Sequence, residues 1–439
     1  MGMVRKASAR RLNLADRIDR NMFLAASPYF QHRFASDPRL LSTFSPSLLT
    51  ISSVTNLVSM FILARQQASA NYPYRVIVSL VLNTATFALL ALSTVAFRSI
   101  PPSGYFAFLM TMVFFASLAT GLCQNGVFAY VNAFNMPKYI QAIMTGQGIA
   151  GVLPCIAQIV SVLAVPPEDD TILPRQSAPP AARESGKSAF AYFLTAVPIS
   201  LFTLLAFLLL TRRNPSTGTS APPSTTKSST VDPPPPPYES LNPSASFDPN
   251  DPDPDPSEDE HPSSRKTVPI LTLYKKLHHL ANAVVVTFIA TMFFPVFTQR
   301  VTTAHPAPDI PRLLQPACFI PLAFLFWNLG DLSGRFLTLS ATITRLTRYP
   351  KIILAMAVVR VVWLPLYELC KRGVVRSDLF YLVVVQFGFG VSNGLLGSLC
   401  MMGAGEWVEP GEREAAGGFM GMMLVAGLSL GSLASFTVT

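Results

Sequence analysis

The sequence predicts an all-α polytopic membrane protein with about ten or eleven transmembrane helices. Half of the 439 residues are hydrophobic and only 13% are charged, whereas soluble domains average about 25% charged residues. The charges gather in short clusters and one long polar stretch. Between them lie apolar runs of about 20 residues, long enough to cross a hydrocarbon core. A soluble protein of this size would instead spread its charges along amphipathic helices.

Ten apolar runs are long enough to cross the membrane. They cover approximately residues 45–64, 75–97, 104–130, 138–165, 188–211, 275–298, 313–340, 351–369, 377–403 and 414–437. A shorter apolar piece, residues 21–34, precedes them and is expected to complete a further span. Several runs contain proline or glycine, which transporter helices tolerate because neighbouring helices or water satisfy the freed backbone groups.

One long polar stretch, residues 212–266, divides these runs into two groups. It is rich in proline, serine, threonine and aspartate, with five consecutive prolines at 233–237. Such a segment cannot bury enough apolar surface to fold. The sequence therefore predicts a polar basic segment at 1–20, a transmembrane bundle at 21–211, a disordered linker at 212–266 and a second bundle at 267–439.

The distribution of lysine and arginine predicts the orientation. With a cytoplasmic amino terminus, the cytoplasmic side holds roughly 20 basic residues and the opposite side about 11, which agrees with the positive-inside rule. Arg335 and Arg360 then lie inside spans. This orientation places the linker in the cytoplasm. It also accounts for the net charge of +9 without a nucleic-acid partner.

No pattern typical of catalysis or of a bound cofactor occurs in the sequence. The five cysteines are not at metal-ligand spacing and fall inside or beside apolar runs, where cysteine usually acts as a small buried hydrophobe. A phosphate-binding loop of the Walker type and a serine–histidine–aspartate order are both missing. The sequence therefore predicts neither an enzyme nor an ATP-driven pump, and no cofactor or metal.

Five motifs occur together in one order. They are the residues at 21–30, Gln124, Thr-Gly-Gln-Gly-Ile-Ala-Gly at 145–151, Asn-Leu-Gly-Asp-Leu-Ser-Gly-Arg at 328–335, and the glycine-rich stretch at 392–401 with Ala-Ala-Gly-Gly at 415–418. In this order, and with the long central loop, they resemble the equilibrative nucleoside transporters. The resemblance implies eleven spans in a six-plus-five arrangement, a fold like that of the major facilitator superfamily, and transport of nucleosides.

Two positions depart from the pattern of that family. Family members carry an apolar half-helix ending in tryptophan before the asparagine that matches Asn21, whereas here Arg20 follows the polar residues at 16–19. Charged residues are costly in lipid, so the first span is expected to be truncated. The other departure is Leu332, where the family commonly has an aromatic residue.

Asn328, Asp331 and Arg335 are the strongest candidates for binding substrate. Their spacing places them within about 60° of one another on one helical face. Charged groups inside a span usually line a cavity. A carboxylate accepts hydrogen bonds from vicinal ribose hydroxyls, and arginine donates to hydroxyl or base acceptors. The resemblance assigns this role to Asp331 and Arg335. The alternative is an ion pair that only holds helices together.

Other polar residues are candidates with a structural alternative beside each. Gln124 has an amide suited to a nucleobase edge, or to a bond between helices. Asn21 and Leu24 match positions that line the cavity in the family, although the altered first span weakens that assignment. Asn393 stands beside a glycine and is a secondary candidate.

The function predicted from these residues is alternating-access transport of nucleosides, with nucleobases as a further substrate class, by facilitated diffusion or ion coupling. A carrier of another polar solute on the same fold is the second interpretation. A non-transporting membrane scaffold or sensor is the third. The expected location is the plasma membrane or a vacuolar or lysosomal-type membrane.

The linker contains one recognisable partner motif. Pro235, Pro236 and Tyr238 fit the PPxY pattern, which WW domains bind as a preformed polyproline helix. The hypothesis is that a WW-containing ubiquitin ligase binds here. The alternative is a solvated spacer in which a proline run matches the pattern by chance.

Overall fold

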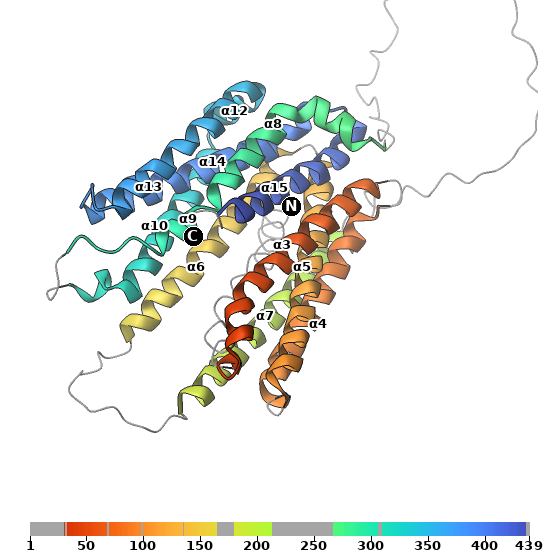
Figure 1. The fold of residues 1–439 in the computed structure, drawn as a ribbon. Helices are drawn as coiled ribbons and strands as arrows, with labels where there is room; N and C mark the ends of the chain where they lie inside the picture. Colours follow the sequence, from red (N-terminus) through yellow and green to blue (C-terminus); the bar gives the residue numbers. More distant parts are fainter. Residues whose placement is uncertain are drawn as a thin grey trace, which may run out of the picture.

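The structure is a computed structural model in which every regular element of the described residues is a helix (Figure 1). The described residues are 30, 33–67, 70–97, 100–134, 136–164, 180–212, 267–305 and 310–435. The predicted amino-terminal segment and almost all of the predicted linker lie outside them.

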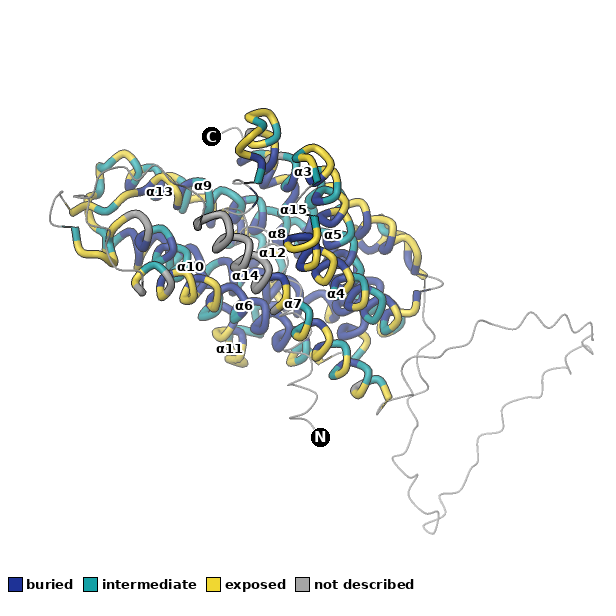
Figure 2. Tube along the Cα trace, turned by 90° about the horizontal axis from the view of Figure 1, so that it is seen from below, coloured by how far each residue is buried: buried dark blue, intermediate teal, exposed yellow. Residues whose placement is uncertain are grey.

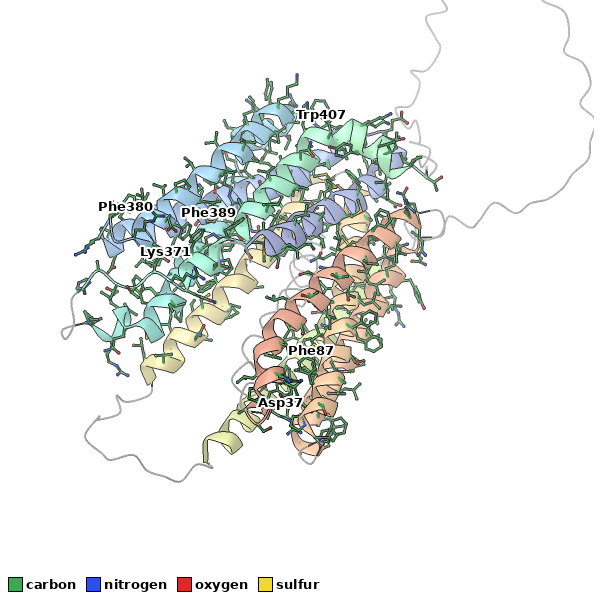
Figure 3. All side chains as sticks on the ribbon, in the orientation of Figure 1. Asp37, Phe87, Lys371, Phe380, Phe389 and Trp407 are labelled. Atoms are coloured by element: carbon green, nitrogen blue, oxygen red, sulfur yellow. The ribbon has the colours of Figure 1, made fainter. Side chains whose placement is uncertain are left out.

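Five helices are described in the amino-terminal half. They are α3 (Pro38–Arg65), α4 (Tyr72–Ala96), α5 (Pro102–Asn132), α6 (Pro137–Ala164) and α7 (Pro180–Arg212). Proline suits the first turn of a helix, because the backbone N–H that it lacks would have no acceptor within the helix there. Asp37 caps α3 by accepting from the Arg39 and Leu40 amides, and lies at its start in Figure 3. Asn71 caps α4 in the same way.

The helices of the carboxy-terminal half are more often interrupted. They are α8 (Ile270–Thr291), α9 (Phe294–Thr298), α10 (Pro316–Leu337), the short α11 (Ala341–Thr344), α12 (Pro350–Val359), α13 (Trp363–Lys371), α14 (Gly388–Gly403) and α15 (Arg413–Ser435). A 3-10 turn at Arg360–Val362 joins α12 to α13, and a π-helical segment at Phe380–Phe387 leads into α14. Short 3-10 turns lie at Arg312–Leu314, Arg345–Arg348, Ala404–Glu406 and Pro410–Glu412.

Eight stretches of the described chain are long and apolar enough to cross a membrane. They are Ser47–Arg65, Tyr72–Ala96, Pro102–Asn132, Pro137–Val160, Ile270–Thr298, Pro350–Lys371, Phe380–Glu406 and Pro410–Ser435. Two further predicted runs coincide with α7, whose apolar part is Val197–Leu209, and with α10, which contains charged residues. The all-α polytopic fold is confirmed. The number of spans stays a prediction, because residues 21–29 are outside the described part.

Apolar side chains cover the outside of the helices as well as the inside. Val54, Leu205, Val359 and Leu433 are each more than half exposed. In Figure 2 the buried positions gather where helices face one another, and the exposed ones follow the outer surface. An apolar outer surface of this kind suits contact with lipid, which is as apolar as leucine itself.

The two halves meet along two sets of helix contacts. Helix α6 packs against α10, and α15 packs against α3 and α5. Within the halves, α4 packs against α5 and α7, while α8 packs against α12 and α15 (Figure 1).

Glycines allow a very close helix contact between α10 and α14. A Cβ atom on Gly334 would lie 2.7 Å from the Leu395 nitrogen, and one on Gly394 would lie 2.7 Å from the Asp331 carbonyl carbon. Only residues without a Cβ atom permit this approach. Gly390 and Gly394 thus lie within the continuous helix α14 and act as packing positions against α10. Pro154 and Pro198 also lie inside continuous helices.

Candidate functional site

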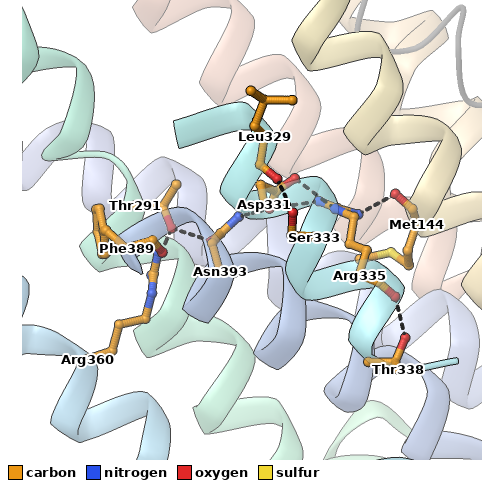
Figure 4. Close-up of polar contacts among 10 residues, drawn as sticks. All are labelled: Met144, Thr291, Leu329, Asp331, Ser333, Arg335, Thr338, Arg360, Phe389 and Asn393. Carbon is orange, nitrogen blue, oxygen red and sulfur yellow. Dashed lines mark hydrogen bonds and ion pairs between the residues drawn. The ribbon is translucent and has the colours of Figure 1, made fainter. Parts of the chain in front are cut away.

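Asp331 and Arg335 form a completely buried ion pair on α10 (Figure 4). The Arg335 Nε donates to Asp331 Oδ2 at 2.8 Å, and its Nη2 reaches Asp331 Oδ1 at 3.3 Å. The spacing of four residues along one helix places the two side chains one above the other. The pair predicted from the sequence is therefore present. Its role in binding substrate stays a prediction.

Arg335 also joins the two halves of the molecule. Its Nη1 donates to the main-chain carbonyl of Met144 on α6 at 2.6 Å. A Cβ atom on Gly148, one turn along α6, would lie 3.1 Å from the Arg335 Cδ. Nearby, Gln141 of α6 donates to the Thr338 hydroxyl at 3.2 Å. The charged pair thus lies directly at the contact between α6 and α10.

Asp331 has a third helix at its other side. Asn393 of α14 donates from Nδ2 to Asp331 Oδ1 at 2.6 Å. The Thr291 hydroxyl of α8 lies 2.7 Å from Asn393 Oδ1, and Arg360 donates to that hydroxyl at 2.9 Å. Asn393 was a secondary candidate from the sequence, whereas Thr291 was missed. Arg360 was recognised only as a charge within a span, although its isolation there was a signal that it had buried partners.

Burial makes this cluster costly to disturb. Removing one partner of a buried pair leaves an uncompensated charge and typically costs about 3–5 kcal/mol. The cluster holds two guanidinium groups, of Arg335 and Arg360, and one carboxylate, of Asp331, all at most 2% exposed. Such an arrangement persists only where polar partners satisfy every group.

Asn328 lies one turn before Asp331 and is 8% exposed. Its amide donates to the Phe324 carbonyl at 2.8 Å and to the Cys155 sulfur of α6 at 3.5 Å. The structure therefore places it at the same contact between α6 and α10, without a hydrogen bond to the charged pair.

Gln124 lies on α5 and is 7% exposed. Its Oε1 is buried and has no hydrogen-bond partner among the described residues. No hydrogen bond there joins it to Asp331 or Arg335. The next residue, Asn125, instead accepts from Arg75 at 2.6 Å. A buried unpaired acceptor costs about 1–3 kcal/mol, so a hydrogen-bond donor placed at the Gln124 oxygen would be stabilising.

The other candidates cannot be placed. Asn21, Leu24, Pro235, Pro236 and Tyr238 all lie outside the described residues. Within the described part of the chain, no group of three metal-ligating side chains comes together.

A separate polar cluster lies outside the spans, where the chain after α9 meets the loop before Phe380. Asp378 accepts from the Thr303 hydroxyl at 2.6 Å, from the Ala304 amide at 2.8 Å, and lies 2.9 Å from His305 Nδ1. Burial raises the pKa of the Asp378 carboxyl, but these three hydrogen bonds outweigh it and hold that pKa below its usual value. The carboxylate thus joins two loops.

Two sugar:proton symporters are among the solved structures with a similar arrangement of helices. A variant of the fucose:proton symporter FucP of E. coli superposes with a TM-score of 0.56 at 13% identity, over 98% of this chain and 91% of that one. The proton:xylose symporter XylE, bound to 6-bromo-6-deoxy-D-glucose, superposes with a TM-score of 0.57 at 11% identity, over 99% and 88%. At these identities the likeness concerns the fold alone, which resembles that of the major facilitator superfamily.

Comparison of sequences assigns the chain to one family among the proteins that share this fold. The family model described as "Nucleoside transporter" matches residues 109–439, and the chain belongs to that family. Among its relatives is the nucleoside transporter FUN26 of Saccharomyces cerevisiae, 27% identical over 437 residues, covering 95% of this chain and 80% of the relative. Another is the human equilibrative nucleoside transporter 2, 25% identical over 460 residues, covering 97% and 94%. The resemblance inferred from the five motifs is confirmed.

Proposed function

We propose that this protein carries nucleosides across a membrane by alternating access, with Asp331 and Arg335 binding the ribose. The observation that supports this most is the position of the buried pair. It lies at the contact between α6 and α10, one helix from each half, and Arg335 donates across that contact to Met144. Carriers of this architecture bind their substrate near the midplane, between the two halves.

The chemistry of the pair fits a sugar with vicinal hydroxyl groups. The carboxylate of Asp331 only accepts hydrogen bonds, and hydroxyls donate them. The guanidinium of Arg335 only donates, and can serve a ribose oxygen or a base acceptor. In this conformation Asp331 is bonded to Arg335 and Asn393. A bound ribose would therefore replace part of these bonds with bonds to its own hydroxyls.

This exchange would couple binding to movement. The bond from Arg335 to the Met144 carbonyl spans the two halves, so it must lengthen or break when they move apart at this level. A substrate that engages Arg335 competes for the same donors. A substrate shifts the balance between two conformations only if it binds one of them more tightly than the other. Competition for the Arg335 guanidinium provides that difference in affinity.

Gln124 is the proposed contact for the base. Its buried acceptor has no partner among the described residues, and an amide can read the paired donors and acceptors of a nucleobase edge. It lies on α5 in the amino-terminal half, whereas α10 belongs to the carboxy-terminal half. A substrate held between Gln124 and the charged pair would touch both halves.

The test is uptake of radiolabelled uridine and adenosine into transporter-deficient cells. Unlabelled nucleosides should compete and glucose should not, and an arm with an imposed pH gradient decides between facilitated diffusion and proton coupling. Asp331→Asn should lower uptake at least tenfold while surface expression stays near that of the wild type. Wild-type uptake by Asp331→Asn would refute the ribose assignment. Parallel loss of expression and uptake would assign the pair to helix packing.

A further inference from the structure

Arg335 and Arg360 head the largest fully buried side chains of the described residues, and the proposed transport mechanism leaves Arg360 without a role. It lies in the 3-10 turn between α12 and α13, is 2% exposed, and forms no ion pair with a carboxylate among the described residues. Its Nε donates to the Ser392 hydroxyl at 2.9 Å, its Nη1 donates to the Thr287 carbonyl, and its guanidinium lies 4.1 Å over the Phe389 ring.

A chain of side chains leads from this guanidinium to the carboxylate of Asp331. Arg360 Nη1 donates to the Thr291 hydroxyl at 2.9 Å, that hydroxyl lies 2.7 Å from Asn393 Oδ1, and Asn393 Nδ2 lies 2.6 Å from Asp331 Oδ1 (Figure 4). Three helices and the α12–α13 turn contribute one member each. Every step is short enough for a full hydrogen bond.

The two ends of this hydrogen-bonded chain of side chains determine the direction in which its hydrogen bonds point. A guanidinium can only donate and a carboxylate can only accept. Thr291 therefore accepts a hydrogen bond from Arg360, and its own proton is directed onward to Asn393. The amide of Asn393 must place its oxygen toward Thr291 and its nitrogen toward Asp331. The reversed amide would bring its oxygen against the carboxylate oxygen.

One acceptor competes with this arrangement. The Thr291 hydroxyl also lies 2.7 Å from the Thr287 carbonyl, and a hydroxyl has a single proton. Arg360 donates to that same carbonyl, which makes it a poorer acceptor for Thr291. Arg360 thus acts twice, by occupying the competing acceptor and by donating to the hydroxyl.

We propose that Arg360 is a positioning residue that holds Asp331 in the orientation in which it accepts from substrate. It acts through Thr291 and Asn393, and its charge stabilises the negative charge of the carboxylate from a distance. The inference rests on the proposed role of Asp331 in ribose binding. It goes beyond that role because it assigns a function to a residue that contacts neither the substrate nor Asp331.

The test compares three substitutions, two within the hydrogen-bonded chain that leads to Asp331 and one at an Arg360 contact outside it. Thr291→Val has nearly the same shape as threonine but lacks the hydroxyl, and should raise the KM for uridine roughly tenfold or more, the effect of losing a hydrogen bond in a charged chain. Thr291→Ser keeps the hydroxyl and should stay within about twofold of the wild type. Ser392→Ala removes an Arg360 contact outside the chain, and should also leave the KM unchanged.

These controls separate positioning from a structural role. If Arg360 only holds helices together, Thr291→Val and Ser392→Ala should act alike, through expression or maximal rate and not through KM. If it positions Asp331, only Thr291→Val should raise KM, and it should also reduce the preference for uridine over 2′,3′-dideoxyuridine. Arg360→Lys, which keeps the charge but not the planar fork, should raise KM in the same way.

Combination with Asp331→Asn distinguishes failure of this inference from failure of the proposed function. Thr291→Val should add nothing to the residual transport of Asp331→Asn, because coupled residues are not additive. Wild-type transport by Asp331→Asn would refute the proposed function. Strongly impaired transport by Asp331→Asn with an unchanged KM in Thr291→Val would overturn the positioning role alone.

Discussion

Gly394→Ala should push α10 and α14 apart and strongly impair transport. The added Cβ atom would lie 2.7 Å from the Asp331 carbonyl carbon, whereas ordinary contact begins at 3.4 Å. The Asp331 carbonyl oxygen would lie closer still, so the difference 3.4 − 2.7 is a lower bound and the helices must open by at least about 0.7 Å. The same opening would lengthen the bond from Asn393 to Asp331, now 2.6 Å, to at least about 3.3 Å. That is beyond the usual upper limit of about 3.2 Å for such a bond.

Two opposing energies decide the outcome of this substitution. Alanine favours a helix over glycine by about 1 kcal/mol. Overpacking costs about 1–3 kcal/mol, and the weakened bond to a charged group up to about 1.5–3 kcal/mol more. The unfavourable terms win. The protein should therefore melt at a lower temperature in detergent, and uridine uptake should fall at least tenfold.

Gly397→Ala is the matched control on the same helix. There the added Cβ atom would lie 3.4 Å from the Phe288 ring, an ordinary contact, so only the helix-forming gain of alanine remains. Its melting temperature should equal or exceed that of the wild type, and its uptake should be unchanged. Equal stability and equal uptake of Gly394→Ala and Gly397→Ala would refute the link between the glycine contact and the site.

Three further predictions concern other parts of the chain. Gln124→Ala should change the ranking among purine and pyrimidine nucleosides more than total uptake, in competition assays; an unchanged ranking would assign Gln124 to helix packing. The pKa of Asp378 is held low, so its bonds to residues 303–305 should stabilise the protein at neutral pH and be lost as pH falls through that lowered pKa. The melting temperature of Asp378→Asn should accordingly depend less on acidic pH than that of the wild type, and parallel curves would contradict this. A peptide of residues 212–266 should bind WW domains, and Tyr238→Ala should prevent binding and lengthen the protein's half-life in cells; equal binding and turnover would leave the segment a spacer.

The apolar runs of the sequence were sufficient to predict the class of fold. Each of the ten runs coincides with one helix or with consecutive helical segments of the described chain, because a span must satisfy its backbone internally and present apolar side chains to lipid. The role of the glycines in α14 could not be predicted from the sequence, because a glycine that bends a helix and one that admits a neighbouring helix look alike there. Only the packing of α10 on α14 distinguishes them.

By itself, the sequence determined the apolar spans, the family and the pairing of Asp331 with Arg335. That pairing is local, since the two residues are four apart on one helix, and helical geometry alone brings them together. The tertiary structure decided the remaining contacts. Asn393 lies 62 positions from Asp331, and Arg360 lies 69 positions from Thr291, separations over which no periodicity predicts contact. The Met144 acceptor is a main-chain carbonyl, a group that every residue carries, so only the packing of α6 on α10 could select it.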